Sequence, residues 1–166
     1  MEAKILEEII GDLMRIPNPT REDVNRIKLK VAGKYGLSRV PSNSEIIRCL
    51  TPPQKAKLLD VLRRKKVRVA SGVTVIAAMT RPWPCPKDEP CIYCPGGPSI
   101  GVPQSYTGHE PAALRGRQNM YDPFLQVKQR INQYLAIGHR VDKVELIIMG
   151  GTFPSAPLEY QRFFVK

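Results

Sequence analysis

Residues 73–98 read VTVIAAMTRPWPCPKDEPCIYCPGGP, and this stretch decides the fold that we expect. Residues 73–79 are mostly apolar and rich in β-branched side chains, which is typical of a buried strand in a parallel sheet. The loop that follows is rich in proline, which lacks a backbone N–H, so the loop can be neither a helix nor a central strand. The stretch therefore predicts a strand with a rigid loop at its carboxyl end, where parallel α/β folds gather their ligands.

Three of the four cysteines lie in this loop, as Cys85, Cys91 and Cys94 in a Cys-x5-Cys-x2-Cys pattern. Thiolates gathered on one short loop usually hold a metal ion or an iron–sulfur cluster. A structural zinc site needs four protein ligands, so zinc would require a fourth ligand such as His109 or His139. A disulfide framework is less favoured, because cysteines are few and three in one loop leave one unpaired. Three thiolates suit an iron–sulfur cluster that leaves one iron open to S-adenosylmethionine.

Downstream of the loop, the pattern predicts a helix over residues 123–137 and a second buried strand over residues 143–149. Asp122 is a suitable cap before the proline that opens this helix, and Gly138 is suited to its end. The apolar face of the helix is expected to comprise Phe124, Val127, Ile131 and Tyr134 or Leu135. Residues 99–119 are expected to be irregular. A strand, a helix and a strand in this order form a parallel βαβ unit with a right-handed connection.

Gly150, Gly151 and Thr152 follow the second strand. A glycine pair at a strand end lets the backbone approach a ligand closely, and its N–H groups can hold an anion. Strand-end glycines are usually only turns, so this signal is weak by itself. Because the cysteine loop follows the neighbouring strand, the two segments together predict a cofactor site.

The first 66 residues predict a helical segment. Apolar spacing predicts a first helix over residues 3–15. Three further helices are expected after the capping residues Thr20, Ser42 or Ser44, and Thr51. The last of these is expected to run to about Lys66. Cys49 falls in an apolar stretch, where we expect a buried structural thiol.

Positive charge is concentrated in the N-terminal part of the chain. The chain carries a net charge of +11, of which residues 1–70 hold +8, from 16 Lys and Arg against 8 Asp and Glu. Such an excess points to a polyanion, with nucleic acid as the first candidate. An ordinary solvated surface is the alternative, and cations also favour a helix C-terminus. We expect RNA phosphates to bind the run of cations Arg63, Arg64, Lys65, Lys66 and Arg68.

The sequence holds no run of about 18 apolar residues, and its N-terminus lacks a signal-peptide core. We therefore expect a cytoplasmic protein with no membrane partner, in which thiols stay reduced. Two parallel strands with one crossover cannot cover both faces of a sheet. Because residues 158–164 look like the start of another helix, we infer a fragment of a longer protein.

Six segments carry a family resemblance: VRVASGVTVIAAMTRPWPCP (67–86), CIYCPGGP (91–98), QSYTGHEPAALRGR (104–117), YDPF (121–124), GHRVDKVELIIMGGTF (138–153) and EYQRFF (159–164). Together they closely resemble the catalytic third subunit of Elongator, a family of radical S-adenosylmethionine tRNA uridine acetyltransferases. Residues 1–66 resemble the family's basic, helical tRNA-binding region more loosely.

The resemblance implies acetyl-CoA-dependent modification of the wobble uridine of tRNA toward 5-carboxymethyluridine, with S-adenosyl-L-methionine cleaved to a radical. It implies that Cys85, Cys91 and Cys94 ligate a [4Fe-4S] cluster. We expect cofactor contacts from Tyr93, Gly96, Gly97, Lys143, Gly150, Gly151 and Thr152. Among these, the resemblance places Tyr93 near the adenine and the Gly150 motif at the methionine amino group, and it associates Lys143 with acetyl-CoA. It assigns no catalytic residue.

The expected fold class is α/β. Residues 1–66 would form a basic helical tRNA-binding region, and residues 67–166 the start of a radical S-adenosylmethionine partial (β/α) barrel, without the C-terminal acetyltransferase domain. Expected partners are tRNA and either other Elongator-like subunits or a second copy of the chain. These 166 residues alone are not expected to complete the reaction. The alternative is a non-catalytic nucleic-acid-binding module stapled by zinc.

Overall fold

The computed structural model describes residues 2–65, 70–89 and 91–166, which fold as two units. The first unit comprises residues 1–72 together with residues 132–141, and the second comprises residues 73–131 and 142–166. The expected domain boundary after residue 66 falls among residues 66–69, outside the described residues.

The first unit is built mainly from α1 (Glu2–Arg15), α2 (Arg21–Lys34), α3 (Asn43–Cys49) and α4 (Pro52–Leu62). The caps predicted at Thr20 and Ser42 are confirmed. Thr20 and Asp23 bond each other's backbone N–H groups before α2, and Ser42 and Glu45 do the same before α3. These reciprocal bonds satisfy N–H groups that a helix start leaves without partners, so each helix begins where its cap stands.

The helices of the first unit enclose one apolar core. The buried side chains are Ile5, Ile9, Ile10, Leu13, Val24, Ile27, Val31, Ile46, Ile47, Leu50, Leu58 and Leu62. One predicted boundary is wrong, because α4 ends at Leu62 rather than near Lys66. Arg63 adopts an extended backbone, and its side-chain Nε donates to the carbonyl of Gly138 at 2.9 Å. The cationic run therefore follows the helix instead of forming its last turn.

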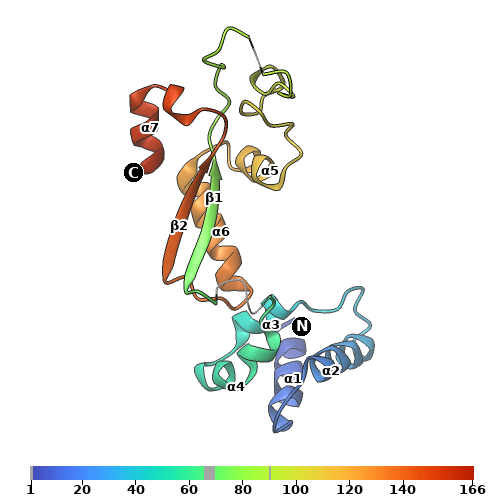
Figure 1. Ribbon diagram of the computed structural model, residues 1–166. Coiled ribbons are helices and arrows are strands. Elements are labelled where there is room, and N and C mark those ends of the chain that lie inside the picture. Colours follow the sequence, from blue (N-terminus) through green and yellow to red (C-terminus); the bar gives the residue numbers. More distant parts are fainter. Residues whose placement is uncertain (1, 66–69, 90) are drawn as a thin grey trace. The chain divides into compact units, whose positions relative to one another are not determined.

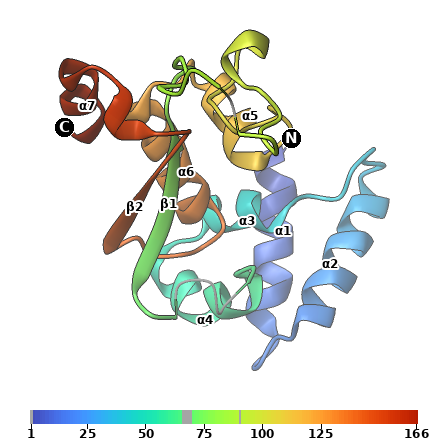
Figure 2. The ribbon, with the colours of Figure 1, turned by 45° about the horizontal axis from the view of Figure 1, so that its top comes forward.

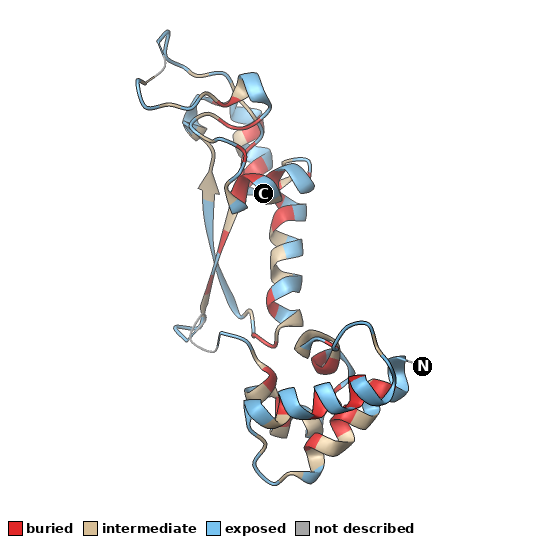
Figure 3. Cartoon of the chain, turned by 90° about the vertical axis from the view of Figure 1, so that its right-hand side faces the viewer, coloured by how far each residue is buried: buried red, intermediate tan, exposed pale blue. Residues whose placement is uncertain are grey.

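The second unit contains a parallel pair of strands, β1 (Val73–Met79) and β2 (Lys143–Met149), paired from Val73 opposite Lys143 to Met79 opposite Met149. Between them in sequence lies α6 (Pro123–Ala136), whose residues 123–131 belong to the second unit and run alongside the strands (Figures 1 and 2). The predicted parallel βαβ unit and the α/β class are thus confirmed. The prediction that this second strand is buried is wrong, because most of β2 is exposed, as the pale blue in Figure 3 shows.

The predicted apolar face of α6 is partly wrong. Tyr134 is buried as expected, but Phe124 and Leu135 are exposed. Gln126 is buried instead, because its amide serves the backbone of β1. The N–H of Met79 donates to Gln126 Oε1 at 2.8 Å, and Gln126 Nε2 donates to the Met79 carbonyl at 2.9 Å.

Residues 99–119 were expected to be irregular, and this expectation is wrong because α5 (Pro111–Gln118) lies within them. A proline in the first turn opens α5, which packs against the carboxyl-terminal end of β1. A side-chain carbon at Gly116 would come within 2.9 Å of both Met79 and Tyr121, so only glycine allows this close approach. A short 3-10 turn, η2 (Pro98–Ile100), precedes α5.

The chain ends in η3 (Phe153–Ser155) and α7 (Leu158–Val165), where the sequence predicted a helix start. This end packs through Tyr160 and Phe164, which are buried with Ala78 of β1. In the described ranges, we find no helix that combines the length and the apolar character needed to span a bilayer.

Candidate metal and cofactor site

A cavity of about 650 Å³ lies where the loop after β1 meets the segment after β2. Its walls are Cys85, Pro86, Lys87, Cys91, Tyr93, Cys94, Gln104, Ser105, Tyr106, Glu110, Gly151 and Thr152. All three predicted thiols therefore line one cavity, together with part of the predicted glycine motif. The parallel pairing of the strands brings these segments to the same sheet edge.

Hydrogen-bond donors surround two of the thiols. Lys87 Nζ donates to Cys91 Sγ at 3.2 Å, and Gln104 Nε2 donates to Cys94 Sγ at 3.1 Å. The bond from the Lys87 ammonium is the main cause that lowers the pKa of Cys91. The pKa of Cys94 is also lowered, first by a hydrogen bond with the backbone of Gly96 and then by the surroundings that include Gln104. A lower pKa favours the thiolate, which is the form that binds metal.

Gly96 and Gly97 do not line the cavity but shape the loop that closes it. The N–H of Ser105 donates to the Gly96 carbonyl at 3.1 Å. A side-chain carbon at Gly97, whose φ is 140°, would lie 2.6 Å from the Pro103 carbonyl oxygen. These glycines therefore let residues 104–105 fold back onto the cysteines.

The residues of the glycine motif after β2 have different positions. Gly151 and Thr152 reach the cavity, whereas Gly150 packs against Thr80, whose hydroxyl donates to the Gly150 carbonyl at 3.2 Å. Gly151 has a left-handed backbone, with φ 58°, and a side-chain carbon there would lie 2.9 Å from Gln104 Cβ. Only glycine allows the strand end to approach the loop this closely.

Of the two remaining predicted cofactor residues, Tyr93 and Lys143, only Tyr93 lines the cysteine cavity. Tyr93 lines the cavity and is largely exposed. Lys143 is the first residue of β2, at the opposite end of the strand from Gly151. With a rise of about 3.3 Å per residue, the strand separates Lys143 from that cavity by about 20 Å. The contact of Lys143 with acetyl-CoA stays a prediction, and it would lie outside the cysteine cavity.

The thiols do not converge on a single ion. Among residues 2–65, 70–89 and 91–166, no three His, Cys, Asp or Glu side chains are grouped as a site for one metal ion. Of the histidines considered for zinc, His139 is buried in the first unit, with Nε2 2.8 Å from the Arg64 carbonyl oxygen. His109 lies in the second unit but does not line the cysteine cavity.

Comparison with known proteins places the chain in a family. Residues 2–70 match the family model described as ELP3 N-terminal domain. Elongator complex protein 3 of Homo sapiens is 42% identical over 99% of this chain and 32% of the human protein. The tRNA uridine(34) acetyltransferase of Methanocaldococcus infernus is 46% identical over 98% of this chain and 31% of that protein. The protein of the same name from Methanocaldococcus jannaschii is 44% identical over 98% of this chain and 30% of that protein. The chain belongs to the Elongator complex protein 3 family. It spans about a third of the length of these curated relatives.

Part of the predicted RNA site lies in residues 2–70, the region that matches the family model. A cavity of about 320 Å³ in the first unit is lined by Arg21, Val24, Asn25, Asn43, Val61, Arg63, Arg64 and Lys65. Three of the predicted cations thus share a cavity with Arg21, a cation that sequence reasoning missed. Arg63 also has a structural bond to Gly138, as described above. Lys66 and Arg68 lie outside the described residues.

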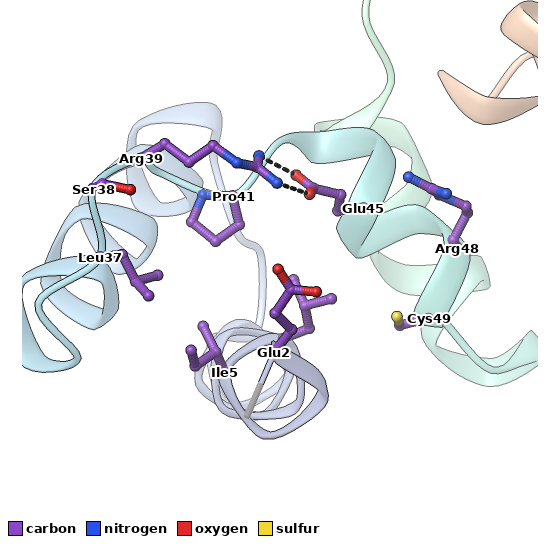
Figure 4. Close-up of a pocket in the computed structure, with 10 residues that line it drawn as sticks. Glu2, Ile5, Leu37, Ser38, Arg39, Pro41, Glu45, Arg48 and Cys49 are labelled. Atoms are coloured by element: carbon purple, nitrogen blue, oxygen red, sulfur yellow. Dashed lines mark hydrogen bonds and ion pairs between the residues drawn. The ribbon is translucent and has the colours of Figure 1, made fainter.

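A third cavity, of about 400 Å³, lies between α1, α3 and the segment that joins α2 to α3 (Figure 4). Its apolar floor includes Ile5 and Pro41, and the ion pair of Arg39 with Glu45 forms one wall. Cys49 also lines this cavity and is exposed, so the prediction of a buried structural thiol is wrong. Helix α3 ends at this residue, which leaves the thiol at an open end of the helix.

Sequence reasoning missed Gln104 and Glu110 in the cysteine cavity. Glu110 accepts hydrogen bonds from the N–H and hydroxyl of Thr107 and from the N–H of Gly108. These bonds, led by the one from the Thr107 backbone, lower the pKa of Glu110 to about 2. The signal that was available was the pair Glu110–Pro111, which is typical of a helix start.

Proposed function

We propose that this chain supplies the cluster-holding and RNA-binding parts of a tRNA wobble-uridine acetyltransferase. The proposed reaction is a radical one, uses S-adenosylmethionine and acetyl-CoA, and leads toward 5-carboxymethyluridine. The observation that carries the proposal is the single cavity lined by three thiols and by Gly151 and Thr152. The archaeal relatives named for uridine 34 of tRNA support the substrate.

We infer that the loop can hold a [4Fe-4S] cluster, because such a cluster binds its three thiolates through three different irons rather than through one ion. Three thiols from one loop face one cavity, and the fourth cysteine, Cys49, lines a different cavity in the first unit. Two of the three have a lowered pKa, which favours the thiolates that iron requires. When bound, such a cluster supplies the electron that cleaves S-adenosylmethionine. Thiolate-rich sites also bind zinc, so the metal must be identified by experiment.

The chain's own groups have three tasks in this proposal. Lys87 and Gln104 donate hydrogen bonds that offset the negative charge of two thiolates. Gly151 and Thr152 bring backbone to the cavity wall, where we expect the amino and carboxylate groups of S-adenosylmethionine to be held. Tyr93 offers an exposed ring beside the last cysteine, where we expect the adenine.

The same proposal gives the rest of the chain its roles. We propose that β1 and β2 begin the partial (β/α) barrel that the family resemblance implies. The first unit would bind the phosphates of tRNA at Arg64 and Lys65, with Lys66 and Arg68 as further contacts. A net charge of +8 over residues 1–70 supports this assignment. Other Elongator subunits or a second copy of the chain are proposed as protein partners.

Electron paramagnetic resonance of the reduced protein tests the proposed cofactor site. The full chain is reconstituted anaerobically with iron and sulfide and reduced, and spectra are recorded with and without S-adenosylmethionine in large excess. We expect S-adenosylmethionine to change the spectrum of the wild-type protein but not that of Gly151→Val, because the added side chain would meet Gln104.

The control is Gly101→Val, which changes another left-handed glycine with nothing within 4 Å of the added carbon. It should keep the response to S-adenosylmethionine. A wild-type spectrum that is unchanged by S-adenosylmethionine would contradict the proposed role of the cavity.

A further inference from the structure

A second cavity of the second unit lies apart from the cysteine loop and has a different chemistry. It measures about 350 Å³ and is lined by Arg81, Met120, Tyr121, Asp122, Tyr160 and Phe163. None of these residues lines the cysteine cavity. Arg81 follows β1, residues 120–122 link α5 to α6, and the last two residues belong to α7. Small-molecule sites commonly occupy about 300–1,000 Å³, so the volume suits a nucleoside-sized ligand.

A cation is fixed against aromatic rings at one wall. The guanidinium carbon of Arg81 lies 4.4 Å from the ring centroid of Tyr160 and 4.6 Å from that of Trp83. These two rings are themselves parallel within 3°, with centroids 5.9 Å apart. The backbone N–H of Arg81 donates to the Tyr160 hydroxyl at 2.9 Å, which anchors the residue. Within the described residues, no acceptor bonds the Arg81 guanidinium, so its donors are available to a ligand.

An exposed aromatic ring forms another part of the cavity wall. Phe163 is 55% exposed, although it sits beside the buried Tyr160, with ring centroids 6.2 Å apart. An exposed ring that is held in place by a neighbouring ring, here tilted from it by 35°, is a suitable platform for a flat ligand. Bases stack on such rings, because every base has a π face.

A strained turn holds the rest of the wall in place. Met120 and Tyr121 are consecutive residues with left-handed backbone, with φ of 52° and 57°. Left-handed backbone is unfavourable for residues other than glycine and persists only where surrounding contacts fix it. Here the Tyr121 N–H donates to the Gly116 carbonyl at 2.7 Å, and its hydroxyl donates to the Gly101 carbonyl at 3.1 Å. Strain of this kind concentrates at ligand sites.

The polar edge of the cavity has both a donor and an acceptor. Asp122 Oδ1 accepts the N–H of Leu125 at 2.8 Å, which caps α6 and leaves the second carboxylate oxygen without a partner in the described part of the chain. Arg81 supplies donors. A simple anion would be repelled by Asp122, whereas the edge of a base offers both donors and acceptors.

We propose that this cavity stacks an unpaired RNA base. Phe163 would contact the face of the base, and Arg81 and Asp122 its polar edge. The inference rests on the proposed function, because it takes RNA as the ligand. It adds a base-binding site in the second unit to the phosphate contacts proposed in the first.

Binding of a short RNA to the full 166-residue chain tests this proposal. The probe is a fluorescein-labelled, single-stranded oligoribonucleotide of mixed sequence, followed by anisotropy. We expect Phe163→Ala to weaken binding by roughly five- to 150-fold, which is the range of one base–aromatic stack. Phe163→Tyr, which keeps a ring, should restore it.

Two controls separate stacking from charge and from misfolding. Phe124→Ala removes another exposed phenylalanine of the second unit, one that does not line the cavity, and should leave binding unchanged. An oligonucleotide of abasic sites keeps the phosphates but has no bases, so it should bind wild type and Phe163→Ala equally. Circular dichroism establishes that each variant is folded.

The results would distinguish RNA from a free nucleotide as the ligand, and some of them would overturn the proposal. Adenosine or uridine monophosphate that displaces the oligonucleotide at equal concentration would mean that a free nucleotide is the ligand, and the RNA assignment would be wrong. Equal binding by Phe163→Ala and Phe124→Ala would overturn the base site. In that case tRNA binding through Arg64 and Lys65 would still stand, whereas loss of tRNA binding by the wild type would count against the proposed function itself.

Discussion

At the scale of single residues, the two hydrogen-bonded thiols of the cysteine loop have different donors. Cys91 accepts from the charged ammonium of Lys87, and Cys94 accepts from the neutral amide of Gln104. Donors to a ligating sulfur stabilise the more negative, reduced state of a cluster and so raise its reduction potential. The loop therefore has two side chains that would tune a bound cluster without binding it.

Replacing Gln104 tests this tuning. We expect Gln104→Ala to retain the cluster but to make its reduction potential more negative, because Cys94 loses a donor. The measurement is an anaerobic redox titration followed by electron paramagnetic resonance. Gln118→Ala, an exposed glutamine of α5, is the control and should keep the wild-type potential. A potential that Gln104→Ala does not shift would contradict a hydrogen bond to the ligating sulfur.

The pKa of Glu110 predicts an acid-dependent loss of stability. Its folded pKa of about 2 lies below the ordinary value of 4.5, so its carboxylate stabilises the fold fully above about pH 4.5. That contribution is lost as the pH falls from about 4.5 toward 2. We expect Glu110→Gln to flatten this part of the stability curve, measured by urea unfolding at a series of pH values. An identical slope for wild type and variant would show that the three hydrogen bonds to Glu110 do not stabilise the fold.

At the scale of elements, features that are local in sequence could be predicted. The caps at Thr20 and Ser42 lie three residues from their partners, so the sequence alone locates α2 and α3. Helix α5 was missed because it is short and depends on contact between Gly116 and the distant Met79. The face of α6 was misjudged for the same kind of reason. Gln126 is buried because it bonds the backbone of Met79 in β1. The residues next to Gln126 in the sequence do not indicate this contact.

Truncation of Gln126 should be costly. In Gln126→Ala, the buried N–H and carbonyl of Met79 both lose their partner. We expect a loss of about 1–3 kcal/mol for each group that stays unsatisfied. The measurement is the free energy of unfolding by urea, with Gln118→Ala as the exposed control. A loss below about 0.5 kcal/mol, the usual size of a surface effect, would mean that water replaces the amide.

For the molecule as a whole, the parts of the cysteine cavity that follow from the order and direction of the strands could be predicted from the sequence. Three cysteines share one loop, and parallel strands bring Gly151 to the same edge, so both could be placed from the sequence. The run Pro95-Gly96-Gly97-Pro98 signals a turn, but no local pattern predicts that the loop folds back far enough there for Gln104 to reach Cys94. The membership of residues 132–141 in the first unit was likewise unpredictable, since it depends on contacts with residues distant in sequence.

The distribution of charge gives a prediction about RNA. Arg64→Gln with Lys65→Gln should weaken binding of all tRNAs alike and reduce the slope of log affinity against log salt by about two, at about 0.9 per phosphate contact. Arg63 is left intact because it also bonds Gly138. The matched control, Lys128→Gln with Lys166→Gln, removes two charges from the second unit and should keep the slope. An unchanged slope in the first variant would mean that these cations only face solvent.

We propose above that Cys85, Cys91 and Cys94 hold a [4Fe-4S] cluster, and metal analysis of the anaerobically reconstituted full chain tests this assignment. We predict a brown protein with about four iron and four sulfide per chain. Cys49→Ala should keep this content, because Cys49 lines a different cavity. The double variant Cys91→Ala/Cys94→Ala should lose both iron and sulfide. A colourless wild-type protein that holds one tightly bound zinc, lost in the same double variant, would contradict the claim.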